Sequence, residues 1–255
     1  MPAAPSISVI TVCRNAEATI SDCLESVRQQ TTIPREHIVV DGLSSDGTTD
    51  TLNHFANPLL AWTSESDQGI GDAMNKGAAR ATGDWLLFLH ADDYLADERV
   101  LEDVTPQLSD DLDLVAGDIL FIYPEDGRSE RRTPRGFGAR NRLKTQFYHQ
   151  AVFIRSDFFR QMNGYDAAFS IAMDYDFFLR AQNARARWKR IPRLISAMRQ
   201  IGVSSRTDWP SLYERFMQEK RCHFKTSPNW RWTTLYVGYW ALYPLYRWAL
   251  SRLRS

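Results

Sequence analysis

The sequence lacks an excess of either charge. Its 255 residues include 31 Lys plus Arg and 31 Asp plus Glu, so the formal net charge is zero. Proteins that bind nucleic acid over a broad surface usually have a basic excess, and nothing here indicates such a partner. Any basic site must therefore be local.

Cysteine is scarce as well. Cys13, Cys23 and Cys222 are odd in number and do not have the spacing of metal ligands, so we expect reduced thiols rather than a disulfide framework. The N-terminus also lacks the charged and then apolar pattern of a secretory signal. Both observations lead us to expect a cytoplasmic protein.

Long apolar runs are missing too. The uncharged stretch from Trp232 to Tyr246 has 15 residues, fewer than the ~20 that span a bilayer, and Pro244 interrupts it. Residues 230–255 nevertheless hold four of the eight tryptophans and four of the ten tyrosines, together with Arg247, Arg252 and Arg254. This composition predicts a helical tail that contacts the inner face of the plasma membrane peripherally. The alternatives are a C-terminal helix packed on the domain and a dimer contact.

What the sequence does contain is an alternation of short apolar runs with amphipathic segments. It predicts an α/β fold with a parallel sheet covered by helices on both faces. After about residue 110 the alternation gives way to closely spaced strands and a hairpin turn at 124–127. The expected strands are 7–12, 38–40, 59–63, 84–89, 112–116, 119–123 and 147–154. We expect one globular unit over 1–228, with halves 1–110 and 111–228, and a tail over 229–255.

Two adjacent carboxylates follow the strand that ends at Leu89. Asp92 and Asp93 would then lie at the carboxyl edge of the sheet, where open α/β sheets bind ligands. Oxygen ligands in that place suit Mg²⁺ or Mn²⁺, and such a cation commonly binds phosphate. The sequence thus predicts a nucleoside-diphosphate site, and the alternative is an Asp-Asp turn that caps a helix starting near Asp97.

Group transfer from a nucleoside diphosphate needs a second carboxylate. The acceptor hydroxyl has a high pKa and requires a base, and a metal-bound carboxylate is a poor base. Asp174, in the first turn of a helix with Asp176, is the candidate, although acids there also simply complement the helix dipole. Asp41, at the end of the second strand, is placed to accept a hydrogen bond from a base or ribose.

A basic segment precedes that helix. From Arg128 to Lys144 there are seven basic residues and one acid, Glu130, with two glycines. We expect either a mobile loop that meets a diphosphate or an anionic acceptor, or a solvated run of charge.

Six segments occur in an order that resembles the motifs of family 2 glycosyltransferases. They are Ser8 to Asn15, Val39 to Thr48, Ser64 to Gly69, Asp72 to Gly77, Gly83 to Asp93, and Asp174 to Asp176. The tract Ile201 to Ser205 is similar to a subgroup that makes colanic acid or other exopolysaccharides. The resemblance implies a GT-A fold: a Rossmann-like nucleotide half, then an acceptor half.

The resemblance also implies roles for individual residues. It implies a nucleotide-diphosphate sugar as donor, a lipid-linked or saccharide acceptor, and transfer with inversion. Asp174 resembles the general base and Asp93 the Mn²⁺ or Mg²⁺ ligand of the DXD motif. The donor would meet Thr11, Arg14, Asp41, Asp72 and Asp92, and the acceptor side would include His149, Gln150 and Asp176.

Three positions depart from the family pattern. His90 occupies a position that is more usually Asn or Asp, Gly71 one that is often aromatic, and Met173 one that is usually acidic. The helices of processive, pore-forming relatives and their Gln-x-x-Arg-Trp signature are also missing, so we expect the transfer of one sugar. The departures keep a second hypothesis open, a catalytically weak or inactive nucleotide-binding protein.

A third hypothesis is a nucleotidyltransferase. Such an enzyme should have a glycine- and lysine-rich phosphate loop after the first strand. The chain has Cys13-Arg14-Asn15-Ala16-Glu17 there, which argues against it.

Overall fold

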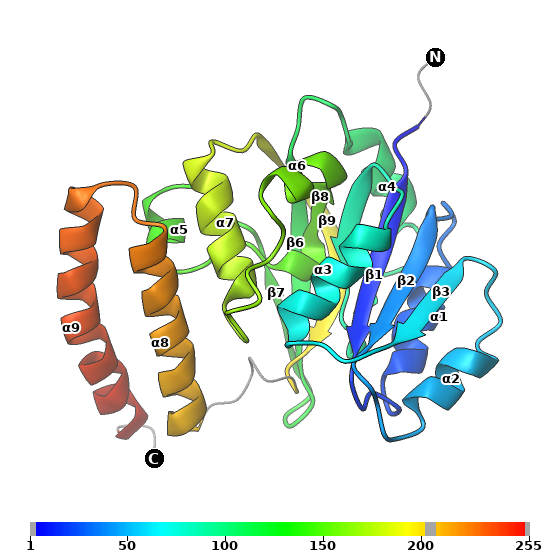
Figure 1. The fold of residues 1–255 in the computed structure, drawn as a ribbon, viewed down its shortest axis with the longest axis horizontal. Coiled ribbons are helices and arrows are strands. Elements are labelled where there is room, and N and C mark those ends of the chain that lie inside the picture. The colour runs from blue at the N-terminus through cyan, green and yellow to red at the C-terminus, as the bar shows by residue number, and fades with distance from the viewer. Residues whose placement is uncertain (1–3, 202–207, 253–255) are drawn as a thin grey trace.

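A computed structural model describes residues 4–201 and 208–252. In this part of the chain, nine strands form one mixed sheet, with strand order β3-β2-β1-β4-β8-β6-β9-β5 and β7 paired to β6 (Figure 1). The strands are β1 (Ile7–Cys13), β2 (Glu36–Asp41), β3 (Leu60–Ser64), β4 (Trp85–Phe88), β5 (Asp93–Leu95), β6 (Leu114–Tyr123), β7 (Arg128–Arg132), β8 (Val152–Arg155) and β9 (Trp188–Arg199).

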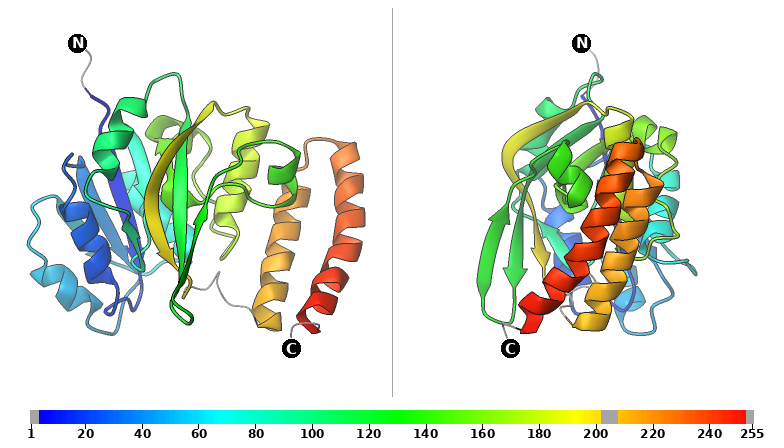
Figure 2. Two further views of the ribbon diagram at one scale, coloured as in Figure 1. Left: turned by 180° about the vertical axis from the view of Figure 1, so that it is seen from behind. Right: turned by 90° about the vertical axis from the view of Figure 1, so that its left-hand side faces the viewer.

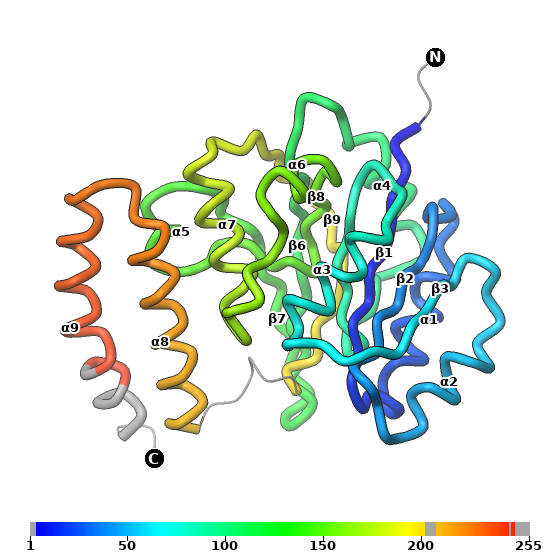
Figure 3. The backbone as a smooth tube through the Cα atoms, in the orientation of Figure 1, coloured from blue at the N-terminus to red at the C-terminus, as the bar shows by residue number. Residues whose placement is uncertain are grey.

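Helices cover both faces of the sheet, as expected (Figure 3). They are α1 (Ile20–Arg28), α2 (Thr48–His54), α3 (Ile70–Arg80), α4 (Val100–Val104), α5 (Ala139–Leu143), α6 (Ser156–Gln161), α7 (Met173–Asn183), α8 (Trp209–Lys225) and α9 (Trp230–Arg252), with 3₁₀ turns η1 (Thr105–Gln107) and η2 (His149–Ala151).

The first half of the sheet is parallel. β1 pairs in parallel with both β2 and β4, and β2 with β3. All seven residues of β1 are buried, because helices cover the sheet on both sides and no face of the strand meets water. The strands predicted for this half are confirmed to within a few residues.

The second half is mostly antiparallel. β8 pairs antiparallel with β4 and β6, while β6 and β9 run in parallel. The two strands expected at 112–116 and 119–123 are one strand, β6, whose register against β9 is irregular around Gly117. A Cβ at Gly117 would stand 2.4 Å from Ile195 Cγ1, so glycine allows β9 to approach closely there.

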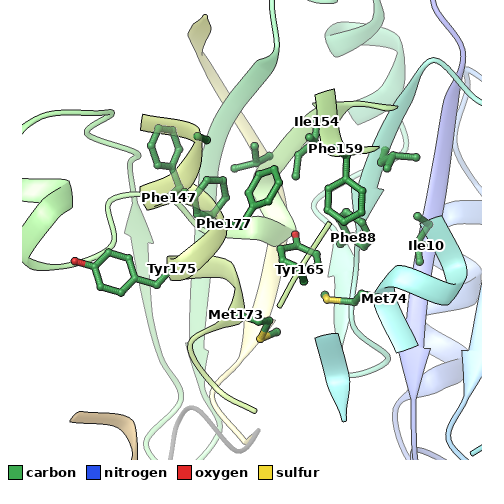
Figure 4. Packing of buried hydrophobic residues seen from close by; sticks show 14 of the residues in the cluster. Ile10, Met74, Phe88, Phe147, Ile154, Phe159, Tyr165, Met173, Tyr175 and Phe177 are labelled. Atoms are coloured by element: carbon green, nitrogen blue, oxygen red, sulfur yellow. The ribbon is translucent and has the colours of Figure 1, made fainter. Parts of the chain in front are cut away.

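One hydrophobic core joins the two halves. Phe88 of β4 lies 5.2 Å from both Phe159 of α6 and Tyr165, and Tyr165 lies 5.4 Å from Phe177 of α7, between ring centroids (Figure 4). Ile10 of β1 belongs to the same cluster. This cluster packs α6 and α7 against β4.

The tail is a helix packed on α8 at one end of the molecule (Figure 2). Leu212 and Phe216 of α8 pack with Tyr236 and Trp240 of α9. The expectation of a helical tail is confirmed, and one of its faces is buried as the packed-helix alternative required. Within the described residues, no helix is both long and apolar enough to cross a bilayer.

A buried histidine links the tail to α7. His223 Nδ1 accepts a hydrogen bond from Trp240 Nε1 (2.9 Å), and its Nε2 lies 2.8 Å from Tyr175 Oη. Burial and the nearby Lys144 lower the pKa of His223 to about 3. A neutral imidazole that accepts at Nδ1 has its proton at Nε2, so His223 donates to Tyr175.

Candidate functional site

The carboxyl ends of β1, β2 and β3 meet at one edge of the sheet. A Cβ at Gly42 would stand 2.5 Å from Asp67 Oδ2 and 3.6 Å from Arg14 Cβ. The three loops therefore lie in contact, and a Cβ at position 42 would require the Asp67 carboxylate to move. Arg14, expected on the donor side, is exposed at this edge.

Asp41 ends β2 with its carboxylate fully buried. Its oxygens accept hydrogen bonds from the Ser44 hydroxyl and backbone N–H (3.0 Å) and from Ser64 Oγ (2.6 Å). Burial raises the pKa of Asp41, but the hydrogen bonds from Ser44 and Ser64 outweigh it, so the pKa lies below its usual value. The carboxylate is thus already satisfied by the protein and shapes the loop that would meet a base or ribose.

Thr11 does not face the site. Its side chain is fully buried, and its hydroxyl lies 2.9 Å from His37 Nε2 and 3.5 Å from Cys23 Sγ. The prediction of a donor contact is corrected here: alternate residues of a strand point to opposite faces, and Thr11 points toward α1.

Asp72 lies in the first turn of α3. Its Oδ2 accepts a hydrogen bond from the backbone N–H of Gln68 (3.0 Å) and pairs with Lys76 Nζ (3.1 Å). The Gln68 N–H and Lys76 lower the pKa of this carboxyl, which is partly exposed. Its described contacts stabilise the start of α3, and the predicted donor contact stays a prediction.

The end of β4 brings together the one imidazole and two carboxylates that follow it. Ligand atoms of His90, Asp92 and Asp93 all lie within 4.8 Å of one another, and we call this group the β4 cluster. Burial and the neighbouring His149 lower the pKa of His90 to about 3, so its imidazole is neutral and has a lone pair to offer. Asp93 begins β5, and the pairing of β5 with β9 fixes the turn that connects β4 to β5.

Asp93 is the buried member of the β4 cluster, with 1% of its surface exposed. Among the described residues, no donor makes a hydrogen bond of normal geometry to either of its oxygens. The Gln150 amide lies beside it but points to Met198 Sδ (3.3 Å). Burial and the adjacent Asp92 raise the pKa of Asp93 well above its usual value. A buried carboxylate without donors is costly and is normally compensated by a cation or a proton.

Arg199 of β9 contacts the backbone of Asp92, the other acidic residue of the cluster. Its Nη1 donates to the backbone oxygen of Asp92 (3.2 Å), and its guanidinium stacks on Tyr94 at 4.9 Å. Burial raises the pKa of Asp92, and the charge of Arg199 partly offsets that rise. Sequence analysis did not identify Arg199, because only the pairing of β5 with β9 brings it to the cluster.

Asp174 lies near the β4 cluster, joined to it by His149. His149 Nδ1 is 3.4 Å from Asp174 Oδ2, and His149 Nε2 is 3.1 Å from His90 Nε2. The side chain of Asp174 is 20% exposed, so its carboxylate can be reached from solvent. The structure therefore brings the candidate base and the carboxylate doublet to one side of the sheet.

The start of α7 is held by α8. Gln218 Oε1 accepts hydrogen bonds from the backbone N–H groups of Ile171 (2.8 Å) and Ala172 (3.2 Å), directly before the helix. These contacts fix the segment that ends in Asp174.

Asp176 does not face an acceptor. Its carboxylate is fully buried and bonds to Arg180 Nε (2.7 Å) and Lys225 Nζ (2.8 Å). The prediction of an acceptor-side role is corrected: Asp176 ties α7 to α8. The spacing of Asp176 and Arg180, four residues apart on a helix, was a sequence signal for such an ion pair.

Two of the departures from the family pattern are in contact. A Cβ at Gly71 would lie 3.5 Å from Met173 Cβ and 3.6 Å from Tyr165 Cβ. A Cβ at position 71 would be in van der Waals contact with Met173, so the two departures describe one contact between α3 and α7.

The basic segment is ordered rather than a loop throughout. Residues Arg128–Arg132 form β7, and Arg131 pairs with the buried Asp118 (2.7 Å). Arg142 of α5 stacks on Trp232 of α9 at 5.4 Å. Where a loop was expected, residues 128–132 form a strand paired with β6 and residues 139–143 a short helix that contacts the tail. The tract Ile201 to Ser205 lies almost entirely outside the described residues.

Comparison with known proteins gives a consistent result. The model of the family described as glycosyl transferase family 2 matches residues 8–166. A "PGL/p-HBAD biosynthesis glycosyltransferase" of Mycobacterium bovis is 32% identical over 248 residues, covering 93% of this chain and 92% of the relative. An uncharacterized glycosyltransferase of Mycobacterium tuberculosis is 37% identical over 189 residues, 71% of this chain and 70% of the relative.

Weaker similarities extend to two other bacteria. The putative glycosyltransferase EpsH of Bacillus subtilis is 28% identical over 49% of this chain and 37% of its own length. Among solved structures, Staphylococcus aureus TarS in complex with UDP-GlcNAc superposes with a TM-score of 0.67 at 20% identity, covering 85% of this chain and 66% of that one. This likeness shows a common fold.

Proposed function

The chain belongs to glycosyltransferase family 2 and is a glycosyltransferase, and from that membership we propose that it transfers one sugar from a nucleotide-diphosphate sugar to a hydroxyl group with inversion. The observation that supports this most is the contact sequence from the β4 cluster through His149 to Asp174. These contacts support the proposal because the residues that we assign to a cation lie near a separate, partly exposed carboxylate.

The β4 cluster fits a divalent cation. Asp93 has two buried oxygens without a described donor, and Asp92 and neutral His90 lie within 4.8 Å. Carboxylate oxygens suit Mn²⁺ and Mg²⁺, and the imidazole nitrogen favours Mn²⁺ of the two. Such an ion, when bound, offsets the negative charge that develops on a departing diphosphate. Asp92, Asp93 and His90 would hold it.

Asp174 supplies the proton acceptor. In a single displacement the acceptor hydroxyl attacks the anomeric carbon as the bond to the diphosphate breaks, and the proton passes to Asp174. Because Asp174 lies on α7 and not on the β4 cluster, the base stays free while the cluster is occupied. Arg14, Asp67 and the loop after Asp41 lie at the same sheet edge and form the wall that we assign to the nucleotide.

The acceptor is proposed to be lipid-linked or a saccharide. The Mycobacterium bovis relative is named for PGL/p-HBAD biosynthesis, which supports a biosynthetic role, and we propose that the product is a glycan such as an exopolysaccharide. We place the enzyme in the cytoplasm, peripherally at the inner face of the membrane.

The activity test measures release of nucleoside diphosphate from a panel of nucleotide sugars with Mn²⁺ and lipid or saccharide acceptors. Asp174→Asn should lower kcat about 10²- to 10⁴-fold, since a lost general base costs that much. Asp157→Asn, on the exposed start of α6, is the control. An Asp174→Asn protein as active as wild type would refute the assignment of the base.

The second candidate is a catalytically weak or inactive nucleotide-binding protein, which His90 at the first DXD position favours. It predicts nucleotide binding by calorimetry without release of nucleoside diphosphate from any sugar in the panel.

Membrane contact is proposed for the exposed face of α9. Trp230 and Leu242 are 73% and 70% exposed, whereas Tyr236 and Trp240 are buried against α8. Deleting residues 230–255 would also uncover α8, so the sharper test is Trp230→Ser with Leu242→Ser. This protein should lose co-sedimentation with vesicles of anionic lipid, while Ile33→Ser, equally exposed at 69%, should keep it. Unchanged binding by the double variant would contradict the proposal.

A further inference from the structure

His149 stands between the two parts of the proposed site. It lies in η2, directly before β8, and β8 runs antiparallel to β4. This pairing brings η2 to the end of β4, where the His149 and His90 rings lie 4.7 Å apart between centroids. The side chain is only 8% exposed, so it is part of the interior of the site.

Both ring nitrogens of His149 face protein groups. Nε2 is 3.1 Å from His90 Nε2, and Nδ1 is 3.4 Å from Asp174 Oδ2. An imidazole has only these two polar atoms, so none is left to bind a sugar acceptor. The expected acceptor-side role of His149 therefore does not agree with its geometry, and a role through its neighbours does.

We infer that His149 is a positioning residue for Asp174: its Nδ1–H donates to Asp174 Oδ2 and holds the carboxylate in place, while its contact with His90 ties that placement to the β4 cluster. The inference rests on the proposed function, in which Asp174 is the base. The other oxygen, Asp174 Oδ1, faces the backbone N–H of Tyr175 (2.7 Å), so two donors fix the orientation of the carboxylate.

The geometry explains why such a residue is needed. Asp174 is partly exposed, and an aspartate with one donor can rotate away from the acceptor. A distance of 3.4 Å is long for a hydrogen bond, and catalytic hydrogen bonds often shorten only when substrate binds. Because His149 also contacts His90, occupation of the β4 cluster by cation and diphosphate would steady the base at the same time.

Three substitutions separate the two contacts of His149. Asn keeps a donor near the position of Nδ1 but does not reach His90, Gln keeps a group near Nε2 but not the donor to Asp174, and Phe fills the space with neither. We expect His149→Phe and His149→Gln to lower kcat ~100-fold with the KM for the sugar nucleotide within about twofold, as for a misplaced catalytic group. His149→Asn should restore kcat to within ~5-fold of wild type. His54→Asn, on the exposed end of α2, is the control and should not change either constant.

A double variant shows whether His149 acts through Asp174. In the Asp174→Asn protein, His149→Phe should cause no further loss of kcat, because the group it positions is already gone. The inference would be overturned if the losses of kcat from the two substitutions multiplied in the double variant. It would also be overturned if His149→Asn and His149→Phe lost kcat equally, or if His149→Phe were as fast as wild type.

Nuclear magnetic resonance gives a readout that does not depend on turnover. In ¹⁵N-histidine-labelled protein, the spin system that disappears in His149→Phe should show a protonated Nδ1, and its Nδ1 resonance should move in Asp174→Ala, while that of His54 should not. The inference would be overturned if Nδ1 were unprotonated, or if its resonance did not move in Asp174→Ala. If wild type transfers no sugar, the proposed function fails and this spectrum alone decides the contact.

Discussion

Asp41 and Asp93 are two buried aspartates at the same edge of one sheet, and their surroundings are opposite. Asp41 accepts hydrogen bonds from Ser44 and Ser64, and its pKa is lowered. Asp93 has no donor of normal geometry in the described part of the chain, and its pKa is raised well above the usual value. Burial raises the pKa of both groups, so the difference comes from the hydrogen bonds that Asp41 accepts and from the charge of Asp92 beside Asp93.

The two aspartates therefore differ in role: one is structural and the other chemical. A carboxylate that the protein satisfies by itself stabilises a loop, and its removal should cost stability. A carboxylate that the protein leaves without donors costs stability and is kept where a ligand compensates it. We therefore expect changes at Asp41 to affect folding, and changes at Asp93 to affect cation binding and turnover.

The largest expected effect is on turnover at Asp93. Asp93→Asn keeps the shape of the side chain but removes its charge, and should lower kcat/KM about 10³-fold, since a cation stabilises the leaving charge by several kcal/mol. Release of nucleoside diphosphate is the measurement. If Asp41→Asn remained folded and lost as much activity as Asp93→Asn, the proposed difference in role between the two aspartates would be wrong.

The next effect is on stability at Asp41. Asp41→Asn should lower the free energy of unfolding by about 2 to 3 kcal/mol, because the charged acceptor of several buried donors is lost. Asp93→Asn, in buffer with a chelator, should cost nothing or stabilise by about 1 kcal/mol. Urea denaturation of the three proteins gives both numbers. Equal destabilisation would show that Asp93 is hydrogen-bonded as Asp41 is.

A smaller effect is expected in acid. The pKa of Asp41 is lower in the folded than in the unfolded chain, so its stabilisation is present above the unfolded value near 3.9 and is lost as the pH falls through the folded value. Between about pH 5 and pH 3, wild type should lose ~1 kcal/mol more stability than Asp41→Asn. Parallel curves for the two proteins would mean that Asp41 does not differ between the folded and unfolded states.

Sequence patterns predicted the first half of the fold well and the second half poorly. The strands β1, β2 and β4 are short runs of mostly buried residues, and short apolar runs of this kind can be recognised in a sequence. Neither β9 nor α8 was predicted. β9 contains Pro192 and several basic residues, so its sequence does not look like a buried strand. Its Arg side chains pair with Asp97 and Asp118 rather than enter the core.

The site followed the same division. Ordered motifs pointed to Asp93 and Asp174, which the structure links through His149 and His90, but a motif does not say which way a side chain points. Thr11 faces the core and Asp176 faces Lys225, and both were misassigned for that reason. The contacts of His149 and Arg199 depend on how β8 and β9 pair with β4 and β5, which are distant in sequence.

Whether Asp93 holds a cation can be measured by titrating the protein with Mn²⁺ in the presence of UDP and following the titration by electron paramagnetic resonance. We expect wild type and Asp41→Asn each to bind one Mn²⁺ per chain, and Asp93→Asn to bind at least tenfold more weakly. Equal affinity in the Asp93→Asn and wild-type proteins would contradict this expectation, because the buried carboxylate would then have no part in holding the ion.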